Sequence, residues 1–418
     1  MTKERYTRST LAIVGTICVA AVSGTPAAQA QTYTQDALHA FKGGASIGTL
    51  IRDARGNLYG TAAGGGTAGA GVVFRLSAAG HYKVLYNFTG GTDGGSPYAG
   101  VIRDSQGNLY GTTYAGGTAS AGVVYKLDTS GQETVLYSFT GGTDGSHPLA
   151  GSLTRDSQGN LYGTAFGGGD SSPNCNAGCG VVFEVDPSGQ ETVLYSFTGG
   201  ADGAGPGAGV IRDAAGNLYG TTVFGGAFDA GVVYKLDPAG NETVLYTFAG
   251  GFDGARPTQG NLVRDGEGNL YGTTQYGGNN EICPGGGGEL QGCGVVYELD
   301  KAGQAYALYA FTGAADGSLP SSGVVRDSEG NLYGTTLFGG AGVCNNGVNS
   351  GCGVVFELTP QGFETVLCAF EGLTSGAEPL SLMRDSAGNF YGTTSIGAEY
   401  GYGVLFELIP SLGGPATL

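Results

Sequence analysis

One sequence motif recurs seven times and constrains the fold more than any other feature of the chain. The motif reads Arg-Asp-x-x-Gly-Asn-Leu/Phe-Tyr-Gly-Thr, and its copies begin at Arg52, Arg103, Arg155, Arg212, Arg264, Arg326 and Arg384. Successive copies start 51, 52, 57, 52, 62 and 58 residues apart. Each copy is followed by a Gly-Val-Val/Leu-Phe/Tyr segment, and most units end in a Gly-Gly-x-Asp-Gly-x-x-Pro link. Repetition at this period is typical of propellers, solenoids and arrays, so the chain is expected to consist of equivalent small units.

Each unit is expected to form four short strands, which we call a to d. In the second unit they cover residues 100–103, 108–112, 122–127 and 133–139. These segments are rich in Val, Tyr, Phe and Thr, which favour strands, and the unit shows no helical period. Asp-x-x-Gly between a and b suits a tight hairpin turn. Seven four-stranded antiparallel units predict an all-β fold, a seven-bladed β-propeller.

The two ends of the repeat array complement each other. The seventh unit stops after its c strand at residues 403–408, and a spare d-like strand, residues 35–41, precedes the first a strand. We therefore expect the N-terminal strand to complete blade seven, which closes the ring and removes open sheet edges. The propeller would be one domain over residues 31–410, followed by a short tail at 411–418.

The first thirty residues are expected to be a secretory signal peptide. Three basic residues within the first eight precede an apolar run at 11–22, and Ala28-Gln29-Ala30 is a small-residue cleavage site. Cleavage near Ala30 would give a secreted or periplasmic chain. No later stretch is long and apolar enough to be expected as a membrane helix.

Composition narrows the classes of function. The formal net charge of −17 makes a nucleic-acid backbone or an anionic membrane surface an unfavourable partner. Three His, two Met and no Trp leave little material for a multi-histidine metal centre or a haem site. The sequence contains no His-Glu-x-x-His motif and no Walker loop. We therefore assign no catalytic residue, no metal ligand and no cofactor, and the balance is against an enzyme.

The repeat also carries a family resemblance. Gly-Asn-Leu-Tyr-Gly-Thr-Thr, followed by Gly-Gly, Gly-Val-Val-Phe/Tyr and Val-Leu-Tyr-Ser-Phe, looks like the GloVer tandem repeat of exported bacterial proteins, over nearly all of residues 35–408. The resemblance implies an exported repeat scaffold of unassigned function, often with a variable surface anchor at one end. The Asp-x-x-Gly-Asn-Leu-Tyr element is similar, more weakly, to NHL-type, streptogramin-lyase-type and lactonase-type propellers.

The cysteines mark enlarged loops. Three close pairs lie between strands b and c of units three, five and six, and they are Cys175/Cys179, Cys283/Cys293 and Cys344/Cys352. Local pairing in an exported chain predicts three disulfides that order these loops, with zinc as the rival interpretation. Cys368 stands where most other d strands carry Tyr, and we expect it to be a buried free thiol.

The expected topology places function on one face of the ring. The a–b and c–d turns are short and uniform on one rim, whereas the b–c loops vary and share the other rim with the d–a links. Variable loops on a rigid scaffold commonly carry binding residues, so this rim is the candidate binding face. We expect ligand contacts from Phe166, Phe224, Tyr276 and Phe338, placed at the second position after strand b, from Tyr114, one residue out of step, and from Asp170, Asn174, Asn279, Asn280 and Asn345 in the insertions.

Several of these residues also have a purely structural interpretation. In that interpretation the aromatic residues pack blade against blade and do not stack on sugar rings. The repeated Arg-Asp pair is expected to serve turns and inter-blade hydrogen bonds, and His147 is the general-base candidate on the variable rim. The Asp-Gly residues of the links would form turns or bind calcium, and they are Asp93, Asp144, Asp202, Asp253 and Asp316.

Together these features predict an exported, monomeric scaffold that binds a glycan or a protein through its variable loop face. The alternatives are a propeller-type lyase or hydrolase that acts at the central mouth of the ring, and a structural component of the cell envelope.

Overall fold

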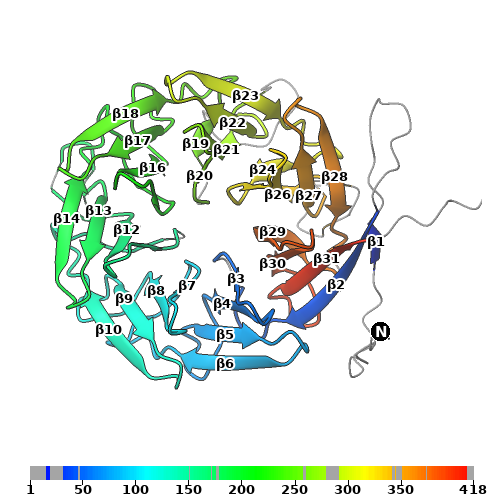
Figure 1. Ribbon diagram of the computed structural model, residues 1–418, viewed down its shortest axis with the longest axis horizontal. Coiled ribbons are helices and arrows are strands. Elements are labelled where there is room, and N and C mark those ends of the chain that lie inside the picture. The colour runs from blue at the N-terminus through cyan, green and yellow to red at the C-terminus, as the bar shows by residue number, and fades with distance from the viewer. Residues whose placement is uncertain are drawn as a thin grey trace, which may run out of the picture.

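The computed structural model describes residues 16–18, 32–45, 48–149, 151–170, 172–175, 178–257, 260–278, 291–340, 344, 351–372 and 374–411. Seven β-sheets surround a central axis, as Figure 1 shows. Each sheet is one blade, with its a strand near the axis and its d strand on the outside. The predicted all-β, seven-bladed propeller is confirmed. In these described ranges we find no helix with the length and apolar character needed to cross a membrane.

The strands repeat in length and order from blade to blade. The innermost a strands are β3 (Ile51–Arg52), β7 (Ile102–Arg103), β11 (Thr154–Arg155), β15 (Ile211–Arg212), β19 (Ala255–Pro257) with β20 (Val263–Arg264), β24 (Ser318–Pro320) with β25 (Val325–Arg326), and β29 (Ala377–Arg384). The b strands are β4 (Leu58–Ala62), β8 (Leu109–Thr113), β12 (Leu161–Ala165), β16 (Leu218–Thr222), β21 (Leu270–Tyr276), β26 (Leu332–Phe338) and β30 (Phe390–Ile396). The c strands are β5 (Val72–Leu76), β9 (Val123–Leu127), β13 (Val181–Val185), β17 (Val232–Leu236), β22 (Val295–Leu299), β27 (Val354–Leu358) and β31 (Val404–Pro410). The outermost d strands are β6 (Tyr82–Asn87), β10 (Glu133–Ser138), β14 (Glu191–Ser196), β18 (Glu242–Thr247), β23 (Ala305–Ala310), β28 (Glu364–Ala369) and β2 (Tyr33–Ala40).

Blade seven is closed by the N-terminal strand, as predicted. β2 runs antiparallel to β31, with Tyr33 opposite Pro410 and Ala40 opposite Val404. On its outer edge β2 also pairs with β1 (Thr16–Cys18), which lies inside the predicted signal peptide. Cleavage near Ala30 would remove this added strand and leave the other four strands of blade seven in place.

The recurring motif folds into a hydrogen-bonded turn. In blade four the Asp213 carboxylate accepts hydrogen bonds from the backbone and side-chain N–H groups of Asn217, at 2.9 and 2.8 Å. The Tyr219 hydroxyl donates to the same carboxylate at 3.1 Å. Gly216 completes the turn with a φ of 91°, in the left-handed region that glycine adopts without strain. Six blades share this arrangement, whereas in blade seven Tyr391 donates to Glu407.

The arginine of each motif joins neighbouring blades. The Arg264 guanidinium stacks on the ring of Tyr219 in the preceding blade, 5.4 Å from the ring centroid. The same contact occurs at all seven junctions, as Arg52/Tyr391, Arg103/Tyr59, Arg155/Tyr110, Arg212/Tyr162, Arg264/Tyr219, Arg326/Tyr271 and Arg384/Tyr333. At the closing junction Arg52 also pairs with Asp385 at 3.4 Å. The Arg-Asp pair is predicted to serve turns and inter-blade hydrogen bonds. The aspartate does hold its turn, whereas the arginine joins the blades by stacking on a tyrosine ring.

Near the axis, the blades pack in pairs. A glycine stands four residues before the motif arginine in blades one, three and five, and three residues before it in blades two, four and six. A Cβ atom on Gly151 of blade three would overlap the backbone of Gly209 in blade four, and Gly48/Gly100 and Gly260/Gly323 repeat this close approach. These glycine approaches join the first six blades in three pairs. Blade seven has no glycine at this position and meets blade six through Ser321, whose hydroxyl donates to the Pro379 carbonyl at 2.6 Å.

A second set of junction contacts lies near the outer edge. The Tyr86 hydroxyl of blade one donates to the Asp93 carboxylate at 3.0 Å, next to Glu133 of blade two. Burial, reinforced by the negative charge of Asp93, raises the pKa of Glu133 to about 7. The equivalent carboxyl groups behave alike, with pKa values raised to about 7 for Glu191 and Glu242 and to about 8 for Glu364.

Removal of β2 is expected to unfold the propeller. A chain that begins at Lys42 lacks the strand that pairs with β31, so the buried side chains of β31 lose their outer cover. A chain that begins at Gln31 keeps β2 and should retain a cooperative thermal transition. Circular dichroism melting of the two chains tests this, and equal melting temperatures would contradict closure by β2.

Stability is expected to fall as pH rises from about 4.5 to about 7. The outer-edge glutamates titrate near 4.5 when unfolded and near 7 when folded, so in this window the folded protein holds protons that the unfolded chain has released. His39, whose pKa burial lowers to about 4, acts in the opposite direction but is one group against four. Melting temperatures measured at pH 5 and pH 8 should differ by several degrees, with the lower value at pH 8.

Replacing three of these carboxyl groups with amides should flatten this pH dependence. Blade seven shows that an amide fits, because Gln35 takes the equivalent place and donates to the Ser375 carbonyl at 2.9 Å. The triple variant is Glu133→Gln, Glu191→Gln and Glu242→Gln. The charge-matched control replaces the exposed Glu267, Glu329 and Glu399 with Gln. An unchanged slope in the first variant would mean that other groups cause the pH effect.

Candidate functional site

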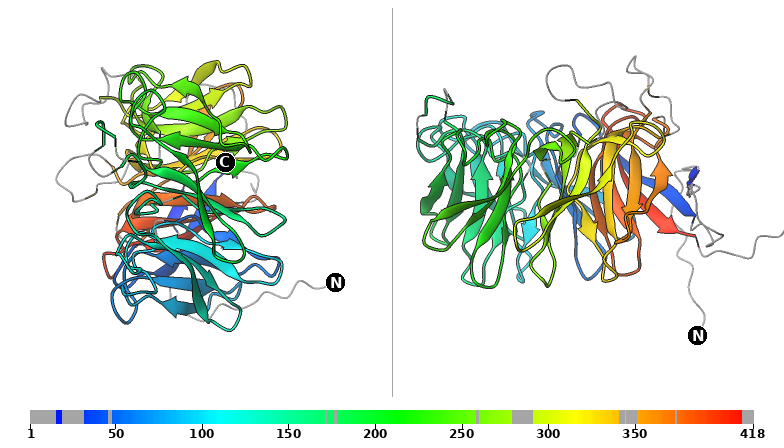
Figure 2. Two further views of the ribbon diagram at one scale, coloured as in Figure 1. Left: turned by 90° about the vertical axis from the view of Figure 1, so that its left-hand side faces the viewer. Right: turned by 90° about the horizontal axis from the view of Figure 1, so that it is seen from above.

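One face of the ring carries the b–c loops and the d–a links, and we call it the loop face. Figure 2 shows the ring from the side, with connections emerging at both faces. The opposite face carries the a–b and c–d turns, including the motif turns described above. The loop face is therefore the part of the scaffold on which residues vary while the blades stay alike.

The residue before the link proline has the same backbone conformation in six links. Its φ lies between 52° and 62°, a left-handed conformation that is unfavourable for residues other than glycine. Its N–H donates to the carbonyl of the residue just before the Gly-Val-Val/Leu segment, as from His147 to Ala121 at 2.8 Å. The six residues at this position are Ser96, His147, Gly205, Arg256, Leu319 and Glu378. The backbone is constant here and the side chain is not, which is the pattern expected of a specificity position.

Aromatic rings beside these link residues form two neighbouring groups across blades two to five, which we together call the aromatic arc. In blade two, the rings of Tyr98 and Tyr114 lie 5.3 Å apart, and Tyr114 lies 4.7 Å from the His147 ring of blade three. In the second group, Phe166 approaches Phe224 of blade four at 6.3 Å. The Phe166 backbone N–H of this group donates to the His147 carbonyl of the other at 3.3 Å. The arc comprises Tyr98, Tyr114, His147, Phe166, Phe224, Arg256 and Tyr276, and each of these side chains is half-buried.

Arg256 forms the far end of the arc. Its guanidinium lies over the ring of Phe224, 5.1 Å from the centroid, and over that of Tyr276, 5.7 Å from the centroid. Two further aromatic side chains on the loop face of blade four, Phe228 and Phe252, are 64% and 80% exposed. Stacking surface and a positive charge therefore occur together in this sector.

The expected offset between Tyr114 and the other aromatic residues is partly wrong. Strand pairing places Ala115 and Gly167 where blade four has Phe224. Tyr114 and Phe166 are therefore equivalent to each other, one residue before the Phe224 position. β8, β12 and β16 end at equivalent residues, so Tyr114 and Phe166 are each the first residue after the strand, whereas Phe224 is the second.

Phe224, Tyr276 and Phe338 share the second position, and packing accounts for two of them. Phe224 packs against the core between blades three and four, and Tyr276 against the core between blades four and five. Phe338 lies opposite Ser318 at the end of β26 and is half-buried. Their half-buried rings contribute an edge to the loop face while their other side fills the junction.

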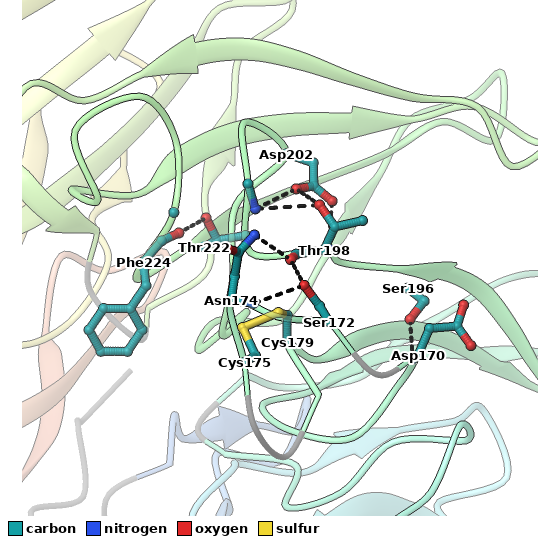
Figure 3. Close-up of a disulfide and its surroundings, with 12 residues drawn as sticks. Asp170, Ser172, Asn174, Cys175, Cys179, Ser196, Thr198, Asp202, Thr222 and Phe224 are labelled. Carbon is teal, nitrogen blue, oxygen red and sulfur yellow. Dashed lines mark hydrogen bonds between the residues drawn. A yellow bond between two sulfur atoms is a disulfide. The ribbon is translucent and has the colours of Figure 1, made fainter.

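Disulfides anchor two of the enlarged loops, and Figure 3 shows the first. Cys175 is bonded to Cys179, and Cys344 to Cys352, as predicted. Both sulfur atoms of the first bridge pack on Gly199 in the link of the same blade, where a Cβ would come within 2.7 Å of each. The bridge therefore ties the b–c loop of blade three to the adjacent d–a link.

The predicted loop residues Asp170 and Asn174 belong to this anchored loop. The Asn174 side-chain amide donates to the Thr198 carbonyl at 3.2 Å, and the Asp170 backbone N–H donates to Ser196 Oγ at 2.7 Å (Figure 3). Both residues are exposed, but neither is among the residues that form the aromatic arc. Asn279, Asn280, Cys283 and Asn345 lie outside the described residues.

Two other cysteines are also oxidised. Cys293 is disulfide-bonded, and its predicted partner Cys283 lies outside the described residues. Cys368 is disulfide-bonded as well, so the expectation of a buried free thiol is wrong. The error arose because a cysteine without a close neighbour in sequence gives no sign of a distant partner.

The Asp-Gly residues of the links hold turns together. The Asp202 carboxylate accepts hydrogen bonds from the Tyr195 hydroxyl at 3.1 Å and from the backbone and hydroxyl of Thr198 at 2.7 and 2.6 Å. Asp93, Asp144, Asp253 and Asp316 accept equivalent bonds from Tyr86, Tyr137, Tyr246 and Tyr309. Within the described ranges, no three His, Cys, Asp or Glu side chains come together as a metal site.

Sequence reasoning missed two members of the arc, Tyr98 and Arg256, and considered His147 only as a base. A signal was present in the sequence, because the residue before the link proline differs in every link although its neighbours repeat. That variation did not reveal function by itself. The left-handed backbone and the rings around it become visible only in three dimensions.

The fold and its repeated turns define a β-propeller of tandem-repeat type. The chain belongs to the Gloeobacter/Verrucomicrobia repeat family, whose profile matches residues 19–174 and 171–342. No curated protein sequence matches the chain.

Several solved structures share the fold at low sequence identity. A catalytically inactive virginiamycin B lyase from Staphylococcus aureus, crystallised with quinupristin, is 11% identical with a TM-score of 0.59, covering 91% of this chain and all of that one. The extracellular domain of a two-component system from B. thetaiotaomicron is 11% identical with a TM-score of 0.55, covering 89% of this chain and 39% of that one. PorZ, a surface component of the Porphyromonas gingivalis type-IX secretion system, is 14% identical with a TM-score of 0.50, covering 88% and 47%.

Loss of the Cys175–Cys179 bridge is expected to loosen its loop without unfolding the ring. The cysteines are 4 residues apart, and closing so short a loop stabilises the folded state by about 2–3 kcal/mol at most. Cys175→Ser with Cys179→Ser should therefore lower the melting temperature slightly and make residues 170–178 more sensitive to protease. Limited proteolysis with mass spectrometry measures this, and cleavage confined to other loops would contradict the anchoring role.

Proposed function

We propose that the protein is an exported binding module that holds a glycan on the aromatic arc of its loop face. The observation that carries this proposal is the succession of half-buried rings, in two neighbouring groups, across blades two to five. Aromatic side chains present flat apolar faces with polar edges, which suits the apolar faces and hydroxyl rims of sugar rings.

The scaffold supports a binding role. Seven junctions with the same arginine–tyrosine contact hold the blades rigid, and residues on the loops and links differ from blade to blade. A rigid scaffold with variable loops reduces the entropy lost on binding, because the contact residues are already in place. The sequence prediction of export fits this role, and the disulfides favour an oxidising compartment.

The alternative function for the same face is that of a propeller-type lyase or hydrolase. It would need an acid–base pair at the mouth, with His147 as the base. Among the described residues, the ring neighbour of His147 is Tyr114 rather than a carboxyl group. This arrangement favours binding by stacking over proton transfer.

A thermal-shift screen of the chain from Gln31 onward against cell-wall oligosaccharides tests the proposal. A ligand present at 100 times its dissociation constant should add about 2.7 kcal/mol of apparent stability. We expect a rise in melting temperature with at least one oligosaccharide. The rise should disappear in the double variant Tyr114→Ala, Phe166→Ala.

The control for this screen is Phe363→Ala, which removes an aromatic ring that is 58% exposed in a c–d turn on the opposite face. It should keep the full ligand-induced shift. The proposal fails if no sugar raises the melting temperature, or if the control loses the shift as completely as the arc variant does.

A further inference from the structure

The arginine at the end of the aromatic arc makes no ion pair with any residue that the structure describes. Among the described residues the structure contains one ion pair, Arg52 with Asp385, so no described carboxylate neutralises Arg256. The Nε atom of Arg256 is buried and makes no hydrogen bond within the described part of the chain. A buried donor without an acceptor is unfavourable, and a ligand oxygen would relieve that cost.

The architecture does not require an arginine at this position. The equivalent residues in the other five links are Ser96, His147, Gly205, Leu319 and Glu378, and all adopt the same left-handed backbone. Arg256 follows this pattern with φ of 52°, and its N–H donates to the Ala230 carbonyl at 2.8 Å. The link thus folds with six different side chains, and the guanidinium is specific to blade five.

The charge of Arg256 is also unusual for its face. The seven motif arginines stack on tyrosines at the blade junctions, near the turns of the opposite face. Among the described residues, Lys42 is the other cation in a link on the loop face, and it lies over the ring of Tyr400 at 4.6 Å. In a chain with a net charge of −17, Arg256 is a local positive site surrounded by aromatic rings.

We propose that Arg256 binds the carboxylate of a uronic-acid oligosaccharide held on the aromatic arc. This inference rests on the proposed glycan-binding function and deepens it. The Arg256 guanidinium lies over the rings of Phe224 and Tyr276, and its planar set of N–H groups suits a carboxylate. The strongly exposed rings of Phe228 and Phe252, on the same face of blade four, offer stacking surface for neighbouring sugar units. An acidic peptide would satisfy the charge but would gain less from flat rings.

Isothermal titration with three probes tests this proposal. The probes are trigalacturonate, its fully methyl-esterified form and a triglutamate peptide. Trigalacturonate should bind most tightly, because the ester lacks the charge and the peptide lacks the sugar rings. In Arg256→Gly the affinity for trigalacturonate should fall roughly 10- to 100-fold, the range for a lost charge-assisted hydrogen bond, while the affinity for the ester stays unchanged.

Arg256→Gly is expected to fold, because Gly205 occupies the equivalent place in blade four and glycine accepts the left-handed backbone. Arg256→Gln is a second variant that keeps the side-chain stem. Arg55→Gln is the charge-matched control, since Arg55 is exposed in a turn on the opposite face and should leave all affinities unchanged.

The outcomes separate this inference from the proposed function. Equal binding of the acid and its ester, with no effect of Arg256→Gly, would overturn the role of Arg256 and leave glycan binding intact. Tighter binding of triglutamate than of trigalacturonate would overturn the uronic-acid assignment. If none of the three probes binds, the uronic-acid assignment is also overturned. The neutral sugars of the thermal-shift screen then test glycan binding separately.

Discussion

The fold depends on a tyrosine that is held by two blades at once. In most blades its hydroxyl is bonded to the aspartate of its own turn, and at every junction its ring face is covered by the arginine of the next blade. Neither contact is strong alone, since a partly exposed cation–π pair contributes about 1 kcal/mol or less. Seven copies arranged in a ring act together, because each junction can form only if the one before it is in register. The outer strand β2 then completes the circle.

This arrangement separates the chemistry of the two faces. The motif turns and c–d turns occupy one face, where they are short, alike and rich in hydrogen bonds. The loop face does not carry these conserved turns, so its loops can lengthen, acquire disulfides and change side chains. The left-handed residue before each link proline combines a constant backbone with a variable side chain. Its backbone is fixed by the repeat, while its side chain, from Gly205 to Arg256, is free to vary.

The ring is also less symmetric than its seven motifs suggest. Glycines alternate between two positions near the axis and join the first six blades in pairs, which leaves blade seven with different partners. At the outer edge, the two junctions of blade seven also use groups other than the glutamates found in other blades: the Gln35 amide on one side and a His39–Tyr82 stack at 3.6 Å on the other. A closing blade with its own contacts makes the correct end-to-end pairing distinguishable from pairing in a shifted register. Family membership and the likeness to solved propellers describe this scaffold, and the loop face is where its function has to be sought.

The sequence by itself determined the scaffold. The spacing of the motif, the Asp-x-x-Gly turns and the spare strand at 35–41 are local or periodic signals. Together they were sufficient to predict seven blades and their closure. Adjacent cysteines likewise predicted their own bridges, because partners close in sequence are necessarily close in space. The tertiary structure decided which residues meet across blades. Tyr114 and His147, Arg256 and Phe224, and the bond made by Cys368 involve contacts between segments far apart in the chain. A repeat predicts that neighbouring units touch. It does not predict which of the few non-repeating residues contact one another, because those contacts depend on how the ring places the blades.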